Sequence, residues 1–297
     1  MFSYFKGKKG LPYLFMIPAL ALILFVYFIP FIYSLVISLT DWNGTSKDMN
    51  FIGLQNFINI FKDRSLLEVL GNTLIYFIEI VVLQNIFGIF TAVLLSGNFK
   101  GRSFFRATLF MPTVVCTVAV GFIWNLMFRP GSGPIPAILD FLNVPGLKDI
   151  LWLGNTSTAI QSIIFVNIWQ WTGWCMVIYI AGLQAIDPSL YEACDIDGAS
   201  IWNKFRFVTL PLLAPSITIN IVMVSIGTLK IFDLPFIMTK GGPGHASESL
   251  SMSIYTNSFL LSKMGYGTAI SLVLFAFILI MTLFQTKYLR KREDNIT

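Results

Sequence analysis

The sequence predicts an all-α protein that crosses a lipid bilayer about six times. Of its 297 residues, 56% are hydrophobic and only 12% are charged, whereas about a quarter of the residues of a soluble domain are charged. Long intervals contain at most one charged residue, and each can supply the roughly 20 apolar residues that a membrane-spanning helix needs. Basic residues gather at the two ends and in short connections, a pattern typical of membrane topology signals.

Six intervals meet this criterion in turn. Gly10–Thr40 and Ala107–Phe128 carry no charge, and Val69–Gly97 carries only Glu79. The other three are charge-free intervals later in the chain, Ile150–Ile186, Phe207–Leu229 and Met264–Thr286. The predicted spanning helices cover residues 12–38, 70–96, 106–127, 159–183, 212–235 and 266–288. Lysines precede the first interval, as in a secretory signal, but its apolar run is too long and lacks a small-x-small cleavage site, so we expect a retained helix.

The distribution of Lys and Arg predicts the orientation of these helices. Twelve lie in the N-terminus, the second and fourth connections and the tail, and seven lie in the other connections. Lys230 falls within the fifth predicted helix and completes the twenty. Since the side with more Lys and Arg faces the cytoplasm, both termini are predicted to be cytoplasmic.

Several classes of function lack the residues that they require. The basic residues form no stripe, and no nucleic-acid-binding module is present. The three cysteines, Cys116, Cys175 and Cys194, are widely spaced without a CxxC pair, and His245 is the single histidine. No metal or cofactor site is therefore predicted. No G-x-x-x-x-G-K-[ST] phosphate loop occurs either, and the segment Gly97–Arg102 does not match it.

The fourth connection, residues 187–211, predicts two short helices joined at a glycine. Pro188 fits the first turn of one helix and Gly198 permits a tight break, after which a second helix from Ser200 brings Trp202 and Phe205 together. The connection carries four carboxylates, Asp187, Glu192, Asp195 and Asp197. A helix resting on lipid is one interpretation, but such helices usually carry Lys and Arg on the polar face. The acidic composition favours a protein partner.

The motif in this connection resembles the EAA loop of bacterial ABC importer permeases. The match comprises Glu192-Ala193, Asp197-Gly198-Ala199, Phe205 and Leu210-Pro211, and Cys194 stands where the family usually has Ala. In that family the loop is a coupling helix that docks in a groove of the ATPase subunit. The resemblance implies an ATPase-coupling role for eight residues, Tyr191, Glu192, Ala193, Asp195, Asp197, Gly198, Ala199 and Phe205.

Four further strings resemble the carbohydrate-uptake subfamily of these permeases, namely Phe51–Phe57, Asn72-Thr73, Phe110–Pro112 and Thr239–Pro243. They are similar to the maltose-, multiple-sugar- and glycerol-phosphate-type permeases, specifically the partner that bears the Gly-Gly-Pro loop. The resemblance implies a MetI-like core of five helices in residues 67–297. Residues 1–66 would supply a cytoplasmic N-terminus, one extra helix and an external loop.

The resemblance also implies the partners and the mechanism. The partners would be a second homologous permease subunit, a cytoplasmic ATPase dimer, an extracytoplasmic solute-binding protein and a sugar substrate, all at the bacterial cytoplasmic membrane. ATP binding would close the ATPase dimer, move the coupling helices and open a central cavity outward. Because this chain has no phosphate loop, we expect no ATPase or other enzymatic site in it.

Two helix faces are candidates for the substrate. Asn167, Trp171 and Trp174 follow i, i+4, i+7 spacing on one face of the fourth helix. Amides and aromatic rings suit sugar hydroxyls and sugar ring faces, although Trp at this spacing also occurs in packing and in interface belts. By resemblance, this face lines the sugar site of maltose-type permeases. The fifth helix offers Ser225, Thr228 and Phe232 at i, i+3, i+7.

Apart from Arg106 and Lys287 at helix ends, three charged residues lie within predicted helices, where such groups usually face a cavity or a partner. Lys230 and Asp233 are three apart and are placed to pair with each other, and Glu79 is either a helix-packing or a cavity group. A secondary transporter or channel would commonly show internal repeats, and none is evident. A membrane enzyme would need an assembled nucleophile, metal set or acid pair. Transport of a glycerol-phosphate-type or other polar solute remains an alternative to a sugar.

Overall fold

The computed structural model describes residues 11–142, 146 and 150–294, with side chains described for residues 16–142, 146 and 150–291. Within these ranges the regular structure is helical, and one isolated antiparallel bridge pairs Thr40 with Phe51. Five helical segments of the described chain are long and apolar enough to span a bilayer, and a bent helix pair makes a sixth if it counts as one span. The predicted all-α polytopic class is confirmed.

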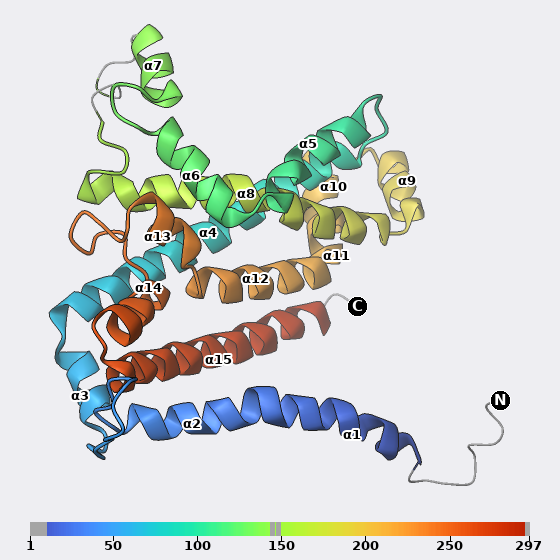
Figure 1. Ribbon diagram of the computed structural model, residues 1–297. Coiled ribbons are helices and arrows are strands. Elements are labelled where there is room, and N and C mark those ends of the chain that lie inside the picture. The colour runs from blue at the N-terminus through green and yellow to red at the C-terminus, as the bar shows by residue number, and fades with distance from the viewer. Residues whose placement is uncertain (1–10, 143–145, 147–149, 295–297) are drawn as a thin grey trace. The chain divides into compact units, whose positions relative to one another are not determined.

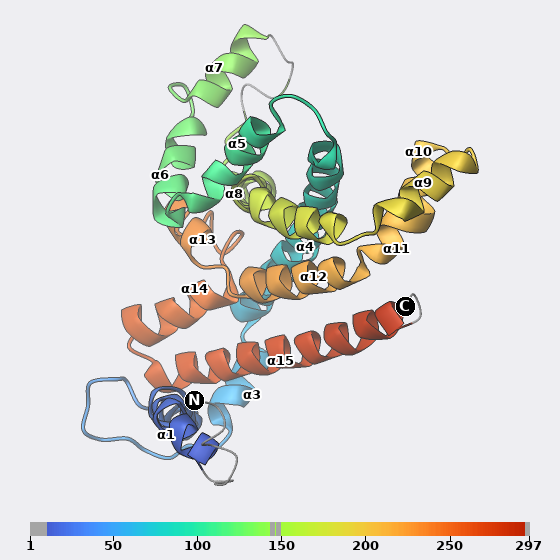
Figure 2. The same ribbon diagram turned by 90° about the vertical axis from the view of Figure 1, so that its right-hand side faces the viewer.

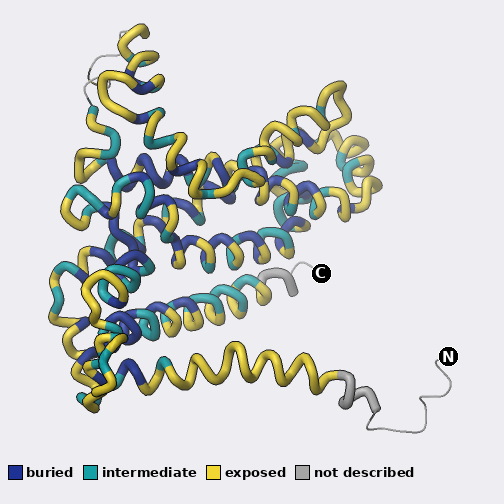
Figure 3. Tube along the Cα trace, viewed as in Figure 1, coloured by how far each residue is buried: buried dark blue, intermediate teal, exposed yellow. Residues whose placement is uncertain are grey.

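Two compact units make up the chain, and one of them comprises Met1–Lys62 and Ile254–Val273. It opens with α1 (Leu11–Ile23), the π-helical turn η2 (Leu24–Phe28) and α2 (Ile29–Ser38), followed by α3 (Gln55–Lys62). The side chain of Asn56 in α3 donates hydrogen bonds to the carbonyl oxygens of Ser38 and Thr40 at 2.9 and 2.8 Å. Most of α2 is exposed (Figure 3), as expected for a helix that contacts lipid or a partner.

The other unit comprises Asp63–Ser253 and Leu274–Thr297. Its helices, shown in Figure 1, are α4 (Arg64–Ser96), α5 (Arg102–Val114), α6 (Thr117–Met127), α7 (Pro134–Phe141), α8 (Thr156–Gln184), α9 (Pro188–Ile196), α10 (Ile201–Lys204), the π-helical η3 (Phe205–Thr209), α11 (Leu210–Leu212), α12 (Ala214–Leu229) and α13 (Asp233–Met238). Then follow α14 (Leu250–Tyr255), the π-helical η4 (Thr256–Leu260) and α15 (Met264–Asp294), of which residues 254–273 belong to the first unit.

The core of this second unit lies where α4, α8 and α12 pack together (Figure 3). Polar side chains are paired at this crossing. Tyr179 on α8 donates to Oδ1 of Asn85 on α4 at 2.5 Å, and Gln84 contacts Sγ of Cys175 at 3.4 Å. In a membrane, polar groups need partners within the protein, so these contacts fix how the helices meet.

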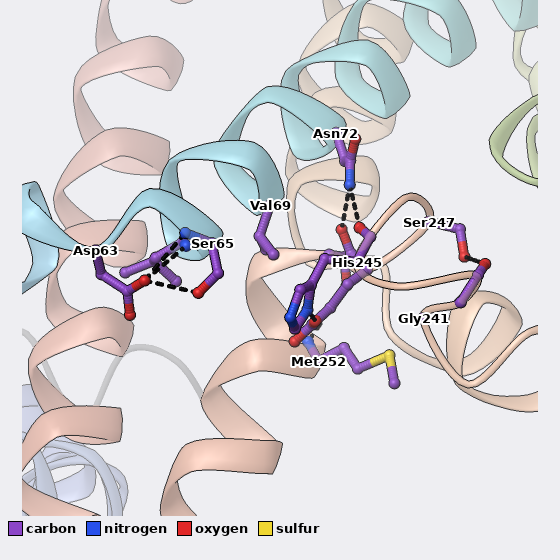
Figure 4. Close-up of polar contacts among 12 residues, drawn as sticks. Asp63, Ser65, Val69, Asn72, Gly241, His245, Ser247 and Met252 are labelled. Atoms are coloured by element: carbon purple, nitrogen blue, oxygen red, sulfur yellow. Dashed lines mark hydrogen bonds and ion pairs between the residues drawn. The ribbon is translucent and has the colours of Figure 1, made fainter. Parts of the chain in front are cut away.

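The start of α4 and a later loop are held by polar contacts (Figure 4). Asp63 caps α4 by accepting a hydrogen bond from the amide of Ser65 at 3.0 Å, which explains why the helix begins six residues before the predicted start at residue 70. Farther along α4, Asn72 donates to the carbonyl oxygens of His245 and Glu248 at 2.6 and 3.3 Å. The His245 ring contacts the Glu248 carboxylate at 2.5 Å. Residues 239–249, which contain the Gly-Gly-Pro string, are thus anchored to α4.

The prediction of one continuous helix over residues 106–127 is wrong. The structure has α5 and α6 instead, bent by 98° at the extended residues Val115 and Cys116. Pro112 lies inside α5 three residues before the bend, and it lacks the backbone amide of a helix-forming residue. The free carbonyl oxygen of Val115 accepts a hydrogen bond from the Gln170 side chain at 3.1 Å, a long-range contact that no local pattern reveals.

The fifth predicted helix, over residues 212–235, is also interrupted. The α12 helix ends at Leu229, residues 230–232 leave the helical path, and α13 begins at Asp233. The backbone of Phe232 has φ of −133° and ψ of −54°, outside the helical range. Its predicted place on a common face with Ser225 and Thr228 is therefore wrong, because that spacing assumed a continuous helix.

Candidate functional site

A cavity of about 330 Å³ lies in the second unit, bordered by α4, α6, α8, α12 and the break that follows α12. Its lining combines aromatic, amide, hydroxyl, charged and aliphatic groups, namely Gln84, Thr117, Asn167, Trp171, Trp174, Met223, Val224, Gly227, Thr228, Lys230, Ile231, Phe232, Asp233 and Leu234. Two interrupted helices border it, since Thr117 follows the bend between α5 and α6 and residues 230–232 form the second break.

The face predicted on the fourth spanning helix lines this cavity. Asn167, Trp171 and Trp174 all contribute to its wall from α8, which is continuous there, so the i, i+4, i+7 spacing holds. Trp174 is 47% exposed within the chain and offers a ring face to an occupant. Neighbouring Ile168 packs on the core instead.

Of the three residues on the second predicted face, two line the cavity and one does not. Thr228 and Phe232 line the cavity, but Phe232 does so from the break and not from a helix face. Ser225 does not line it. Its hydroxyl is 1% exposed and accepts a hydrogen bond from Nε2 of Gln285 on α15 at 3.0 Å. The prediction that Ser225 reaches the cavity is therefore wrong, because its position on α12 directs it toward α15.

The charged residues within the predicted helices have different surroundings. Lys230 and Asp233 are both exposed and both line the cavity, and no ion pair joins them in the described part of the chain. The break that separates them removes the i, i+3 geometry on which pairing depends. Glu79 instead accepts a hydrogen bond from Nε2 of Gln161 on α8 at 3.0 Å, so it serves helix packing.

Sequence reasoning missed two polar residues of the wall, Gln84 and Thr117. An amide within an apolar span is a signal in its own right, and Gln84 is such a residue in α4. No local signal marks Thr117, because it reaches the cavity only through the bend before α6. Together the lining supplies ring faces, hydrogen-bonding amides and one charge of each sign, which suits a hydroxyl-rich solute.

The second candidate site is the bent pair α9 and α10, which projects beyond the ends of α8 and α11 (Figure 2). Gly198, with φ of +70°, makes the break between the two helices, as predicted. Asp187 caps α9 by accepting a hydrogen bond from the amide of Ser189 at 2.9 Å. This backbone hydrogen bond, with the Ser189 side chain, holds the pKa of the Asp187 carboxyl below its ordinary value.

The surface of this pair mixes acidic and apolar groups. Glu192, Asp195 and Asp197 are exposed, and Asp195 forms an ion pair with Lys204. The rings of Trp202 and Phe205 meet with centroids 5.7 Å apart, as predicted, and the Tyr191 hydroxyl contacts Oγ1 of Thr209 at 3.0 Å. Large apolar side chains are also exposed, namely Ile196, Ile201, Trp202 and Phe207. Ala193 is exposed and Ala199 half-buried.

Known proteins are similar in sequence along nearly the whole chain. The trehalose/maltose transport system permease protein MalF of Thermococcus litoralis is 33% identical over 292 residues, covering 98% of this chain and 97% of that protein. The multiple sugar-binding transport system permease protein MsmF of Streptococcus mutans is 32% identical over 277 residues, covering 93% and 94%. The probable ABC transporter permease protein YurN of Bacillus subtilis is 35% identical over 290 residues, covering 97% and 99%.

A solved structure shares the fold. A bacterial ABC transporter involved in the import of the acidic polysaccharide alginate superposes with a TM-score of 0.82 at 21% identity, covering 95% of each chain. The family model for the binding-protein-dependent transport system inner membrane component matches residues 84–293, more than half of the chain. The resemblance to carbohydrate-uptake permeases is confirmed. The chain belongs to the family of inner membrane components of binding-protein-dependent transport systems, as a multi-pass permease subunit of the ABC importer type.

Proposed function

We propose that this chain forms half of the pathway by which an ABC importer carries a carbohydrate, delivered by an extracytoplasmic binding protein, across the membrane. The observation that supports the substrate class is the wall of the cavity, where Trp171, Trp174 and Asn167 stand together. Aromatic ring faces pack on the apolar faces of sugars, and the amide bonds to hydroxyl groups. The names of the trehalose/maltose and multiple-sugar relatives support the same class.

Lys230 favours a second candidate, a phosphorylated sugar or another anionic polar solute. Its ammonium group lines the cavity without an ion-pair partner in the described part of the chain. A cation at such a site attracts a phosphate or carboxylate. Asp233 in the same wall opposes an anion, however, so a neutral carbohydrate remains the first candidate.

Energy for transport comes, in this proposal, from an ATPase dimer that receives α9 and α10. The exposed carboxylates of Glu192 and Asp197 suit basic residues, and the apolar Ile196 and Trp202 suit a groove. A second permease subunit would close the open side of the cavity. The division into residues 1–66 and 67–297 stays a prediction, with the first helix as an addition to a five-helix core.

The substrate is tested with the complete importer in proteoliposomes. Uptake of labelled mono-, di- and trisaccharides is measured with binding protein outside and ATP at the nucleotide-binding side, together with a sugar phosphate. Competition by unlabelled neutral saccharides supports the carbohydrate. Competition by the sugar phosphate alone favours the second candidate. ATP-dependent uptake of neither would contradict both.

The orientation is tested separately. The excess of Lys and Arg in the segments that include both termini favours a cytoplasmic position for these termini. A reporter enzyme fused after Thr297 should therefore be active only if it functions in the cytoplasm. Activity of an external reporter at that position would contradict the proposed topology.

A further inference from the structure

At the bend between α5 and α6, one side chain from α8 forms hydrogen bonds to both sides of the break. Gln170 is fully buried, and its Nε2 donates hydrogen bonds to the carbonyl oxygen of Val115 at 3.1 Å and to Oγ1 of Thr117 at 3.2 Å. In return, Oγ1 of Thr113 donates to the backbone carbonyl oxygen of Gln170 at 2.8 Å. These three contacts bracket the two extended residues of the break.

The contact to Val115 replaces a backbone hydrogen bond that the break removes. In a continuous helix the Val115 carbonyl would accept the amide of Ala119, and a membrane supplies no water to take its place. An unpaired backbone carbonyl in that environment is strongly unfavourable. The hydrogen bond from Gln170 therefore satisfies the backbone carbonyl that the break leaves free.

The other end of the same amide shows why the residue is Gln. Its Oε1 is buried and has no hydrogen-bond partner within the described part of the chain. A buried acceptor without a partner is unfavourable, so an apolar side chain of similar size would be preferred if Gln170 only filled space. The two hydrogen bonds donated by Nε2 offset this cost, which an apolar side chain could not do.

The bend in turn shapes the cavity. Thr117, the first residue of α6, lines it, and Asn167, Trp171 and Trp174 line it from the same part of α8 as Gln170. Gly173 brings the backbones together, because a Cβ there would lie 2.2 Å from the carbonyl oxygen of Leu109. The two walls of the cavity are thus joined at Gln170.

We propose that Gln170 is a positioning residue that holds the α5–α6 bend and thereby the Thr117 wall of the translocation cavity. It does not line the cavity itself. The effect on transport rests on the proposed function, whereas the effect on the bend does not. The bend and the transport are therefore measured separately, so that a failure of the proposed role of Gln170 can be told from a failure of the proposed function.

The bend is measured as the distance between spin labels at Phe104→Cys in α5 and Leu126→Cys in α6, both exposed positions. Cys116→Ser and Cys194→Ser remove the accessible thiols, and the buried Cys175 stays. A straight helix would separate these positions by about 33 Å at 1.5 Å per residue. With the bend of 98° the same rise gives about 20 Å.

In the complete importer, Gln170→Met should lengthen or broaden this distance by about 5 Å or more. Gln184→Met, at an exposed position at the end of the same helix, should leave it unchanged. Solute imported per ATP hydrolysed should fall at least fivefold for Gln170→Met, while ATP hydrolysis stimulated by the binding protein persists.

An unchanged distance in an assembled Gln170→Met importer overturns the proposal, whatever the transport rate. If Gln170→Met does not assemble, Thr117→Val decides, because it removes only one of the two acceptors. A broader distance distribution in that variant supports the proposal, and an unchanged one overturns it. Should the wild-type importer carry none of the tested solutes, the proposed substrate fails and the distance test still stands.

Discussion

Ser249 donates a hydrogen bond from Oγ to the carbonyl oxygen of Ile231 at 2.5 Å. Ile231 lines the cavity from the break between α12 and α13, and Ser249 ends the loop of residues 239–249. Both residues are buried, and the same Oγ accepts a hydrogen bond from the amide of Met252 at 3.3 Å. One hydroxyl therefore pairs with the Ile231 carbonyl at the break and caps the start of α14. It also links the loop to the cavity wall.

Replacing this hydroxyl should weaken the second break. Ser249→Ala leaves the Ile231 carbonyl and the Met252 amide without a partner, and we expect a loss of about 1–2 kcal/mol in the stability of the complex. Thermal unfolding of the purified importer measures this loss. The matched control is Ser251→Ala, two residues along α14. Equal unfolding temperatures for both variants would show that the Ser249 contact contributes nothing.

The sequence was sufficient to predict the long apolar helical segments, because an apolar run of more than 20 residues has few alternatives in a protein. The two helix breaks were not predictable in the same way. Each is stabilised by a side chain distant in sequence, Gln170 for the bend before α6 and Ser249 for the break after α12. Pro112 is a local helix-breaking residue, but the bend falls three residues after it.

Predictions of site residues divide along the same line. Asn167, Trp171 and Trp174 lie in an uninterrupted helix, so their spacing correctly placed them on one wall. Ser225 and Phe232 depend on a helix that ends between them, and their predicted shared face does not exist. The break at Gly198 was predictable because its signals are local in sequence, a helix-starting Pro188 and the glycine itself.

The cavity wall is tested by shortening its aromatic and amide groups. Trp171→Ala removes a stacking surface, which should cost the substrate on the order of 1 kcal/mol or more, about fivefold in affinity. Asn167→Ala should have a comparable effect, because a polar group of the solute loses its partner. Uptake across a series of saccharides measures both. Val177→Ala, on the same helix but outside the cavity wall, is the control.

One result would contradict a role of this wall in binding the solute. If Trp171→Ala and Asn167→Ala import every saccharide with wild-type kinetics, the wall is structural and does not contact the solute. Stimulation of ATP hydrolysis by the binding protein should stay near the wild-type level in both variants. A loss of this stimulation would instead indicate defective assembly.

Close packing of α5 on α8 should make Gly173 intolerant of any side chain. A Cβ there would lie 2.2 Å from the Leu109 oxygen and 2.7 Å from Cα of Phe110, which are backbone atoms that cannot rotate away. Gly173→Ala should destabilise the complex by about 1–3 kcal/mol. Gly71→Ala is the matched control, since a Cβ there meets no atom within 4 Å, and helix propensity predicts no loss. Similar unfolding temperatures for the two variants would refute the close contact.

The break at Gly198 separates the effect of backbone conformation from that of side-chain volume. A Cβ at Gly198 would meet no atom within 4 Å, so space is available, but φ of +70° disfavours most L-residues. Gly198→Val adds a β-branched residue that resists this conformation, and we expect about 1–2 kcal/mol of strain and a loss of transport with the chain still inserted. Gly198→Asn should keep most of the transport, because Asn tolerates left-handed conformations. Uptake and co-purification of the ATPase measure the two variants side by side, and equal activity of Val and Asn at this position would show that the bend of α9 on α10 is not needed for coupling.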